Sequence, residues 1–281
     1  MHLITLSALF RLTRFWNLVI IAIAQYFAAA FLLHLNFSVF SDWQLFVLSL
    51  STVLIAAAGY IINDYYDIKI DLINKPDRVV IGKSITRRYA ILFHTFISST
   101  GILLGVVVGW KIGAINFICV FLLWLYSNNL KRQPFIGNLA VAVLTGLSID
   151  MINLLYNVHN TLVIIYSLFA FFMTLVREIV KDMEDMKGDT TFGCRTLPIV
   201  WGIRKTKNLL YVIILIFAIA VIAINKYYLL MPAYYFIIIL FFPLAILIFR
   251  LIRADTKKEF YQLSQLCKLI LLMGIMSMIF I

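Results

Sequence analysis

Two acidic segments constrain how this chain can be arranged: Asn63-Asp64-Tyr65-Tyr66-Asp67-Ile68-Lys69-Ile70-Asp71 and Lys181-Asp182-Met183-Glu184-Asp185-Met186-Lys187-Gly188-Asp189. Each segment has aspartates at offsets 0, 3 and 7 and a lysine at offset 5, counted from its first aspartate. If each segment is helical, a rotation of about 100° per residue places the three carboxylates within an arc of about 60°. Each segment therefore predicts a helix with one acidic face. We call these faces the first acidic ladder (63–71) and the second acidic ladder (182–189).

Each ladder follows a long apolar run, and such runs recur along the whole chain. Of the 281 residues, 63% are hydrophobic and only 13% are charged, with a mean hydropathy of +1.00. A water-soluble domain carries about 25% charged residues, so this composition excludes an ordinary soluble protein. Repeated apolar runs of about 20 residues also differ from the one short run of a secretory signal. The sequence predicts an all-α, polytopic membrane protein.

The apolar runs between polar breaks predict nine transmembrane helices in one integral membrane domain, 1–281. The predicted spans are 15–35, 43–62, 87–109, 112–129, 135–157, 161–180, 206–225, 230–249 and 262–281. An odd number of spans places the two termini on opposite sides of the membrane. The ladders then follow spans two and six, which end on the same side.

The distribution of basic residues indicates the orientation of these spans in the membrane. One side of the predicted topology holds 22 of the 24 Lys and Arg residues, and the other holds only Lys111 and Lys226. By the positive-inside rule, the N-terminus and the long polar loops lie in the cytoplasm. In a membrane protein the net charge of +11 reflects topology and attraction to anionic lipid, so no nucleic-acid partner is expected. Any polar chemistry is expected at the cytoplasmic face.

The ladders predict a divalent metal site. Carboxylates stacked on one helix face repel one another unless a cation neutralises them, and sets of oxygen ligands suit Mg²⁺ or Ca²⁺. Mg²⁺ commonly completes its shell with water and substrate phosphates. Three cysteines, Cys119, Cys194 and Cys267, offer neither a disulfide framework nor a Cys-x-x-Cys metal site.

Basic residues near both ladders could bind the oxygens of a phosphorylated substrate. Our candidates for diphosphate binding are Arg78, Lys131, Arg132 and Lys181. The alternative is that these charges only orient the chain in the membrane. Carboxylates for metal and cations for phosphate, at the mouth of an apolar helical bundle, fit a substrate with a diphosphate head and a hydrocarbon tail.

At the two ladders the sequence resembles the UbiA superfamily of intramembrane prenyltransferases, whose signatures have the forms NDxxDxxxD and DxxDxxxD. The likeness extends to Tyr126-Ser127-x-x-Leu130-Lys131-Arg132 and to the stretch from Arg177 to Pro198. Within the superfamily, NDYYDIKIDLINKPDR and REIVKDMEDMKGD are most similar to the branch that makes digeranylgeranylglyceryl phosphate, an ether-lipid precursor. Members often carry Arg-Pro-x-Asn near the first span, whereas this chain reads Arg14-Phe15-Trp16-Asn17.

The resemblance implies nine helices around a central apolar cavity, two Mg²⁺ ions bridging a diphosphate, and release of an allylic carbocation. By position, it implies Asn63, Asp67, Asp185 and Asp189 as direct metal ligands. Asp64, Asp71 and Asp182 would act through water or as positioning groups. Further candidates for substrate binding are Asn17, Tyr126, Asn138 and Arg195.

The leading hypothesis is Mg²⁺-dependent transfer of a prenyl group, with geranylgeranyl favoured, from its diphosphate to the hydroxyl of a prenylglyceryl phosphate. The expected partners are a prenyl diphosphate donor, a lipid-like acceptor and the bilayer of a prokaryotic cell. An alternative keeps the donor and uses an aromatic acceptor of quinone biosynthesis, such as 4-hydroxybenzoate or a naphthoate. A cation or phosphate transporter is a more distant alternative, because transporters place such acids near the membrane midplane.

Overall fold

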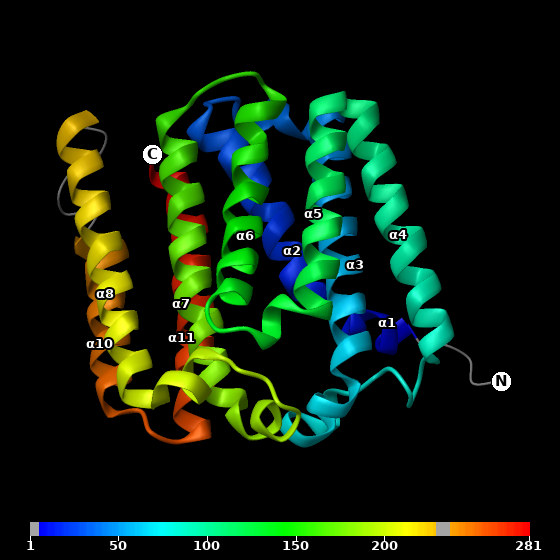
Figure 1. Cartoon of the computed structure of the whole chain (residues 1–281). Helices are drawn as coiled ribbons and strands as arrows, with labels where there is room; N and C mark the ends of the chain where they lie inside the picture. Colours follow the sequence, from blue (N-terminus) through cyan, green and yellow to red (C-terminus); the bar gives the residue numbers. More distant parts are fainter. Residues whose placement is uncertain (1–5, 229–236) are drawn as a thin grey trace.

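The computed structural model describes residues 6–228 and 237–281, and these residues are almost entirely helical (Figure 1). The long helices are α2 (Phe15–Phe27), α3 (Trp43–Asn74), α4 (Arg87–Val108), α5 (Trp110–Asn128), α6 (Ile136–Leu155), α7 (Thr161–Thr191), α8 (Leu197–Tyr228), α10 (Phe242–Arg253) and α11 (Lys257–Ser277). The shorter elements are α1 (Leu6–Leu12), η1 (Ala28–Leu32), η2 (Asn36–Ser41), η3 (Pro76–Arg78), η4 (Leu130–Arg132), η5 (Ile237–Phe241) and η6 (Met278–Phe280).

Eight helical stretches among the described residues are long and apolar enough to cross a membrane. They correspond to eight of the nine predicted spans, and they confirm an all-helical, multi-pass membrane protein. The remaining prediction, 230–249, begins at residues that lie outside the described ones. Its described part is helical and consists of η5 and α10.

Two helices, α3 and α7, continue well beyond the C-terminal ends of the spans predicted for them. The apolar runs end near residues 62 and 180, but α3 continues to Asn74 and α7 continues to Thr191. Backbone hydrogen bonding therefore continues through both acidic segments, which supplies the helical geometry that the offsets of 0, 3 and 7 require. Both ladders lie on rigid helix ends that extend beyond the apolar part of the bundle.

The long helices stand roughly side by side, with α4 and α5 at one edge of the bundle and α8 and α10 at the other (Figure 1). Between them, α3, α6, α7 and α11 form the middle, and the packed pairs include α3 with α4, α6 with α7, and α7 with α11. The lower ends of α3 and α7 lie next to each other in this view. The bundle thus brings the two ladders to one end of the molecule.

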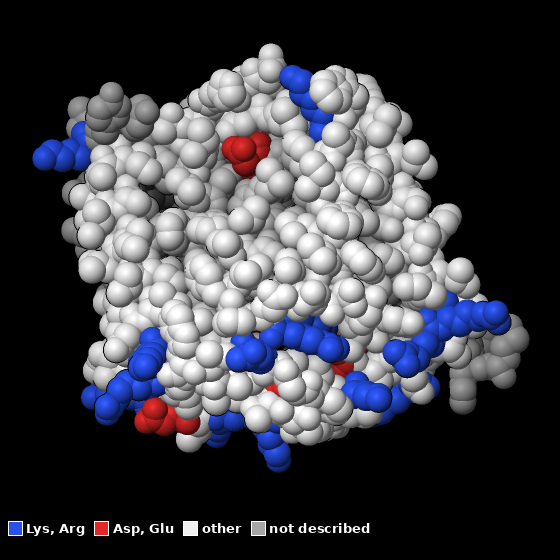
Figure 2. Space-filling model, in the orientation of Figure 1, with Lys and Arg blue, Asp and Glu red and all other residues white. Residues whose placement is uncertain are grey.

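The charge distribution separates the two ends of the bundle. In Figure 2 the Lys and Arg side chains gather at the lower end, and the middle of this face is nearly free of charge. The loops that follow α3, α5 and α7 also lie at this lower end (Figure 1). The asymmetry read from the sequence is therefore present in the folded molecule, and the ladders lie at the basic end.

The chain enters the bundle through a tight turn that the sequence pattern did not predict. The short helix α1 packs Ala8 and Leu12 against Ile61 of α3. Between α1 and α2, Arg14 takes the left-handed backbone conformation with φ of 52°. Although proline is missing at the next position, α2 still begins at Phe15. The turn directs Arg14 toward the first ladder.

Candidate functional site

Asn74, the last residue of α3, joins the two ladder helices. Its side-chain Nδ2 donates to the backbone oxygen of Asp185 at 2.9 Å, and the backbone N–H of Gly188 donates to its Oδ1 at 2.9 Å. A Cβ atom at Gly188 would lie only 2.5 Å from Asn74 Nδ2. Glycine at this position therefore permits the close approach that places the ladders side by side.

Lys75 extends this contact to the side chains of the second ladder helix. Its Nζ lies 2.6 Å from Asp185 Oδ2 and 3.4 Å from Glu184 Oε1. Burial opposes the charge of Lys75, but the carboxylates of Asp185 and Glu184 outweigh it and raise the pKa of Lys75. Sequence reasoning missed Lys75, although it lies only four residues after the end of the first ladder, in the segment NKPDR.

Lys131 binds the first ladder from the loop between α5 and α6, where its ammonium contacts the carboxylate of Asp67. The same loop meets the segment after α7, because the backbone N–H of Arg195 donates to the carbonyl of Arg132 at 2.8 Å. Cys194 lies among these groups. Burial and the charges of Asp189 and Asp67 raise its pKa, against the opposing influence of Arg132 and Lys131. Asp67 and Asp189, one from each ladder, lie within electrostatic range of each other.

Arg14 binds the start of the first ladder. Its Nη2 lies 2.9 Å from Asp64 Oδ1, and its guanidinium carbon lies 4.8 Å from the centre of the Tyr60 ring. Burial opposes the charge of Arg14, but Asp64, Tyr60 and Asp71 together raise its pKa. Asn17 lies beside this pair, with its Nδ2 donating to Tyr60 Oη at 3.3 Å.

The start of the second ladder faces α6. Asn138 is buried and its Nδ2 donates to Asp182 Oδ2 at 2.9 Å, so the structure brings these two predicted residues together. Lys181 instead turns to Glu178, with Nζ 2.8 Å from Oε2. It therefore pairs one turn deeper in α7 rather than with a ladder aspartate.

The other predicted residues differ in their exposure. Tyr126, Asp71 and Asp189 are half-buried at the same end of the bundle, whereas Arg132 and Arg195 carry exposed side chains. The backbone of Arg78 belongs to η3, but its side chain lies outside what the structure describes.

The ladder oxygens fit a magnesium site by their chemistry. Asn63 Oδ1 and Asp185 Oδ1 are buried and accept no hydrogen bond from the described residues, and both atoms belong to the predicted ligand set. Buried oxygens of this kind are costly unless a donor or a cation satisfies them. In the described residues no three acidic, histidine or cysteine side chains meet at one point. Lys75 and Lys131 neutralise Asp185 and Asp67 in this arrangement.

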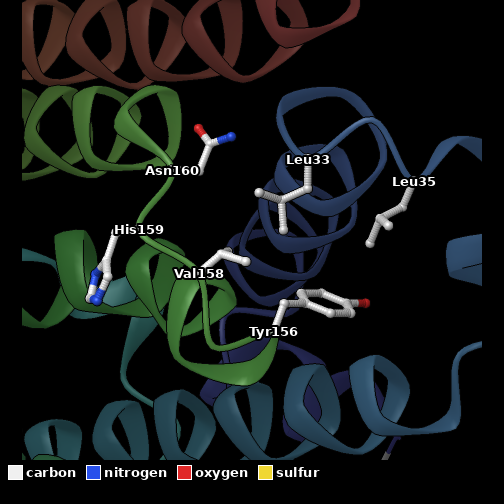
Figure 3. A pocket seen from close by; sticks show the side chains of 6 residues that line it. All are labelled: Leu33, Leu35, Tyr156, Val158, His159 and Asn160. Atoms are coloured by element: carbon white, nitrogen blue, oxygen red, sulfur yellow. The ribbon is translucent and has the colours of Figure 1, made fainter.

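A pocket of about 520 Å³ opens at the end of the bundle opposite the ladders (Figure 3). Its lining residues are Leu33, Leu35, Tyr156, Val158, His159 and Asn160. Nearby, Tyr156 Oη donates to Asp42 Oδ2 at 2.6 Å, which connects the end of α6 to the start of α3. The pocket contains none of the ladder residues. The acidic and basic groups converge at the ladder end of the bundle, and this end is therefore the candidate active site.

Comparison with known proteins gives relatives for most of the chain. A model of the UbiA prenyltransferase family matches residues 18–269. The digeranylgeranylglyceryl phosphate synthase of Methanosphaera stadtmanae is 38% identical over 164 residues, which cover 58% of this chain and 60% of that protein. The chain thus spans less than two thirds of the length of this relative. Further relatives with the same name match at 35% to 39% identity.

Solved structures share the fold. A structure described as giving insights into digeranylgeranylglyceryl phosphate synthase in membranes superposes with a TM-score of 0.73 at 24% identity, covering 98% of this chain and 97% of that chain. A UbiA homolog from Archaeoglobus fulgidus, bound to DMAPP and Mg²⁺, gives a TM-score of 0.63 at 16% identity, covering 98% of this chain and 100% of that chain. At these identities the likeness concerns the fold.

Proposed function

This chain belongs to the UbiA prenyltransferase family, and we propose that it transfers a geranylgeranyl group from its diphosphate to the hydroxyl of a prenylglyceryl phosphate. The product is an ether, the new C–O bond replacing the bond to diphosphate, with the hydroxyl proton released. The observation that carries the proposal is the convergence of two acidic ladders with Lys75 and Lys131 at one end of an apolar bundle. The similarity to digeranylgeranylglyceryl phosphate synthases supports this choice of acceptor.

The ladders are proposed to hold the donor diphosphate through Mg²⁺, with two ions expected. Asn63, Asp67, Asp185 and Asp189 are the proposed direct ligands, and Asp64, Asp71 and Asp182 are proposed positioning groups. The unpaired oxygens of Asn63 and Asp185 support this assignment. Bound Mg²⁺ supplies positive charge where the departing diphosphate becomes more negative.

The side chains of the protein are proposed to stabilise the same developing charge. Lys131 and Lys75 both lie against ladder carboxylates and can turn to phosphoryl oxygens. Fixed cations at the leaving group lower the barrier because its charge grows as the allylic C–O bond breaks. The apolar helices exclude water from the prenyl cation until the acceptor hydroxyl attacks.

The site is proposed to face the cytoplasm, and residues 1–281 are proposed to form a single catalytic domain. The basic residues gather at the ladder end of the bundle, as the positive-inside rule expects of a cytoplasmic face (Figure 2). Both ladders occupy this one end, which disfavours a transporter with acids near the midplane.

An acceptor comparison tests the proposal. Purified protein is incubated with labelled geranylgeranyl diphosphate and, separately, with geranylgeranylglyceryl phosphate, 4-hydroxybenzoate or a naphthoate, each with Mg²⁺ or with EDTA. We expect labelled ether lipid from the glyceryl phosphate alone, and only with Mg²⁺. Product from an aromatic acceptor alone would instead assign the chain to quinone biosynthesis, and metal-independent product would contradict the role of the ladders.

A further inference from the structure

A second charged cluster lies where α2, α7 and α11 meet, apart from the ladder ion pairs. Arg177 and Lys181 both bind Glu178, with Nη1 2.7 Å from Oε1 and Nζ 2.8 Å from Oε2. On α11, Lys268 Nζ donates to Asn17 Oδ1 of α2 at 2.8 Å. Lys268 also lies within electrostatic range of Arg177. We call Arg177, Lys181 and Lys268 the basic cluster.

The basic cluster holds three cations, and the two carboxylates beside it are Glu178 and Asp182, which leaves one positive charge in excess. Glu178 is 6% exposed, and both of its oxygens are already taken by Arg177 and Lys181. Lys268 has an amide rather than a carboxylate as its partner among the described residues. The Nε of Arg177 is buried and makes no hydrogen bond to any described residue. A buried donor without a partner, such as this Nε, is unfavourable unless an acceptor oxygen satisfies it.

Arg177 and Lys268 lie apart from the proposed metal ligands, whereas Lys181 directly precedes Asp182 of the second ladder. Arg177 precedes Asp182 by five residues, so it lies about 7 to 8 Å deeper along α7. Asp182 faces Asn138 of α6, whereas Lys268 approaches from α11. The side chains of Arg177 and Lys181 are 23% and 24% exposed, so a ligand can reach them. An anion bound here lies close to the donor site without sharing its metals.

Building on the proposed function, we propose that the basic cluster binds the phosphate monoester of the acceptor lipid. A phosphate monoester carries up to two negative charges and several strong acceptor oxygens, which match Arg and Lys donors. Lys268 has no carboxylate partner to give up, so it contributes most directly to this binding. The glyceryl hydroxyl is then held beside the prenyl carbon of the donor, with the acceptor tail among the apolar helices.

The test replaces Lys268 by Gln in the full-length protein, with Lys258→Gln as the matched control. Lys258 is an exposed lysine on the same helix. We expect Lys268→Gln to raise the KM for geranylgeranylglyceryl phosphate by about tenfold or more, because a charge-assisted contact is lost. The KM for geranylgeranyl diphosphate should remain unchanged, Lys258→Gln should behave as wild type, and Lys268→Arg should restore much of the acceptor affinity.

Two further measurements separate phosphate recognition from a general structural effect. With geranylgeranylglycerol, which lacks the phosphate, wild type and Lys268→Gln should react equally slowly. Without donor and in EDTA, geranylgeranylglyceryl phosphate should raise the unfolding temperature of wild type but not of Lys268→Gln. Inorganic phosphate is added in the same assay as a comparison. If the cluster were a site for free phosphate, inorganic phosphate would raise the unfolding temperature of wild type as much as the lipid does.

Several results would overturn this inference. A rise in the donor KM alone would assign the basic cluster to the diphosphate, and equal losses with both acceptors would indicate a structural role. Equal stabilisation by inorganic phosphate would contradict a site for the lipid. If wild type uses no glyceryl phosphate acceptor at all, the proposed function itself fails. If wild type uses it and Lys268→Gln is unaffected, only the inference fails.

Discussion

At the scale of single residues, the proposed chemistry depends on carboxylates that cannot be replaced by neutral groups. Asp67→Asn and Asp185→Asn each keep the shape of the side chain and remove its charge. We expect each to lower kcat/KM by about 10²-fold or more, since charge at the leaving group is the main catalytic term. The assay is product formation across a range of Mg²⁺ concentrations.

Asp150→Asn provides the matched control for these two variants. Asp150 lies on α6, where its Oδ1 accepts from Asn153 Nδ2 at 2.9 Å, and it belongs to neither ladder. This variant should keep wild-type activity and the wild-type sensitivity to EDTA. Full activity of Asp67→Asn and Asp185→Asn in EDTA would show that the ladders do not act through metal.

For Lys131→Met we expect opposite effects on metal binding and on turnover, because Lys131 and a metal ion would compete for Asp67. Removing the ammonium leaves the partly buried Asp67 carboxylate without its partner, so the metal-free protein should unfold at a lower temperature. Mg²⁺ should bind more tightly because its competitor is gone, whereas turnover should fall because the leaving group loses a cation. Thermal unfolding measured during a Mg²⁺ titration, together with kcat, separates these effects.

Lys69→Met is the control, because Lys69 is an exposed lysine on α3, the helix that carries Asp67. It should change neither the Mg²⁺ affinity nor turnover. Weaker Mg²⁺ binding by Lys131→Met would mean that Lys131 supports the metal site rather than competing for it.

The residue types of the site could be predicted from the sequence, but several of their partners could not. The equal spacing of the aspartates indicated both ladders, because a local helical repeat determines which side chains share a face. The roles of Asn74 and Lys75 could not be predicted in this way, because their contacts join positions more than 100 residues apart. Only the packing of α3 against α7 creates those contacts.

At the scale of elements, the crossing of α3 and α7 determines whether the ladders can act together. Gly188→Ala would normally stabilise a helix by about 1 kcal/mol, because alanine has the higher helix propensity. Here the added Cβ would lie 2.5 Å from Asn74 Nδ2, and Asn74 is held by two hydrogen bonds. We therefore expect Gly188→Ala to lower the unfolding temperature and to raise the Mg²⁺ concentration needed for half-maximal activity.

Gly109→Ala is the matched control for Gly188→Ala. A Cβ atom at Gly109 has no neighbour within 4 Å, and its φ of 176° is open to any residue. This variant should leave stability and Mg²⁺ dependence near wild type. A stabilised, fully active Gly188→Ala protein would show that the Asn74 contact is not needed.

Eight of the nine predicted spans correspond, in the predicted order, to long apolar helices among the described residues, but the ends of these helices were not predictable. Hydropathy finds where a helix lies in lipid, so the predicted spans stop at the first charged residues of each ladder. Helical hydrogen bonding has no such limit, and α3 and α7 continue to Asn74 and Thr191. The short helix α1 lacked a sufficient apolar run and was missed.

At the scale of the whole molecule, the two ends of the bundle have different chemistry. The ladder end combines the acidic groups with most of the basic residues, whereas the opposite end carries the pocket near Tyr156. Positive-inside sorting accounts for the basic residues, because Lys and Arg are retained on the cytoplasmic side. The acids need a separate cause, since carboxylates contribute little to topology. Metal and diphosphate binding is that cause in the proposed function.

The orientation of the bundle gives the last prediction. Lys83→Cys places a thiol on the exposed loop between α3 and α4 at the ladder end, and Phe37→Cys places one on exposed η2 at the opposite end. An impermeant maleimide should label Lys83→Cys only in inside-out membrane vesicles and Phe37→Cys only in right-side-out vesicles. The unmodified protein gives the background. It should be low because Cys194 and Cys267 are buried, and burial raises the pKa of the Cys194 thiol, keeping it protonated. Cys119 is half-buried, but it lies within the apolar span formed by α5, which an impermeant reagent does not enter. The reverse labelling pattern would place the ladders outside the cell, where the acceptor and donor would have to be supplied from the other face of the membrane.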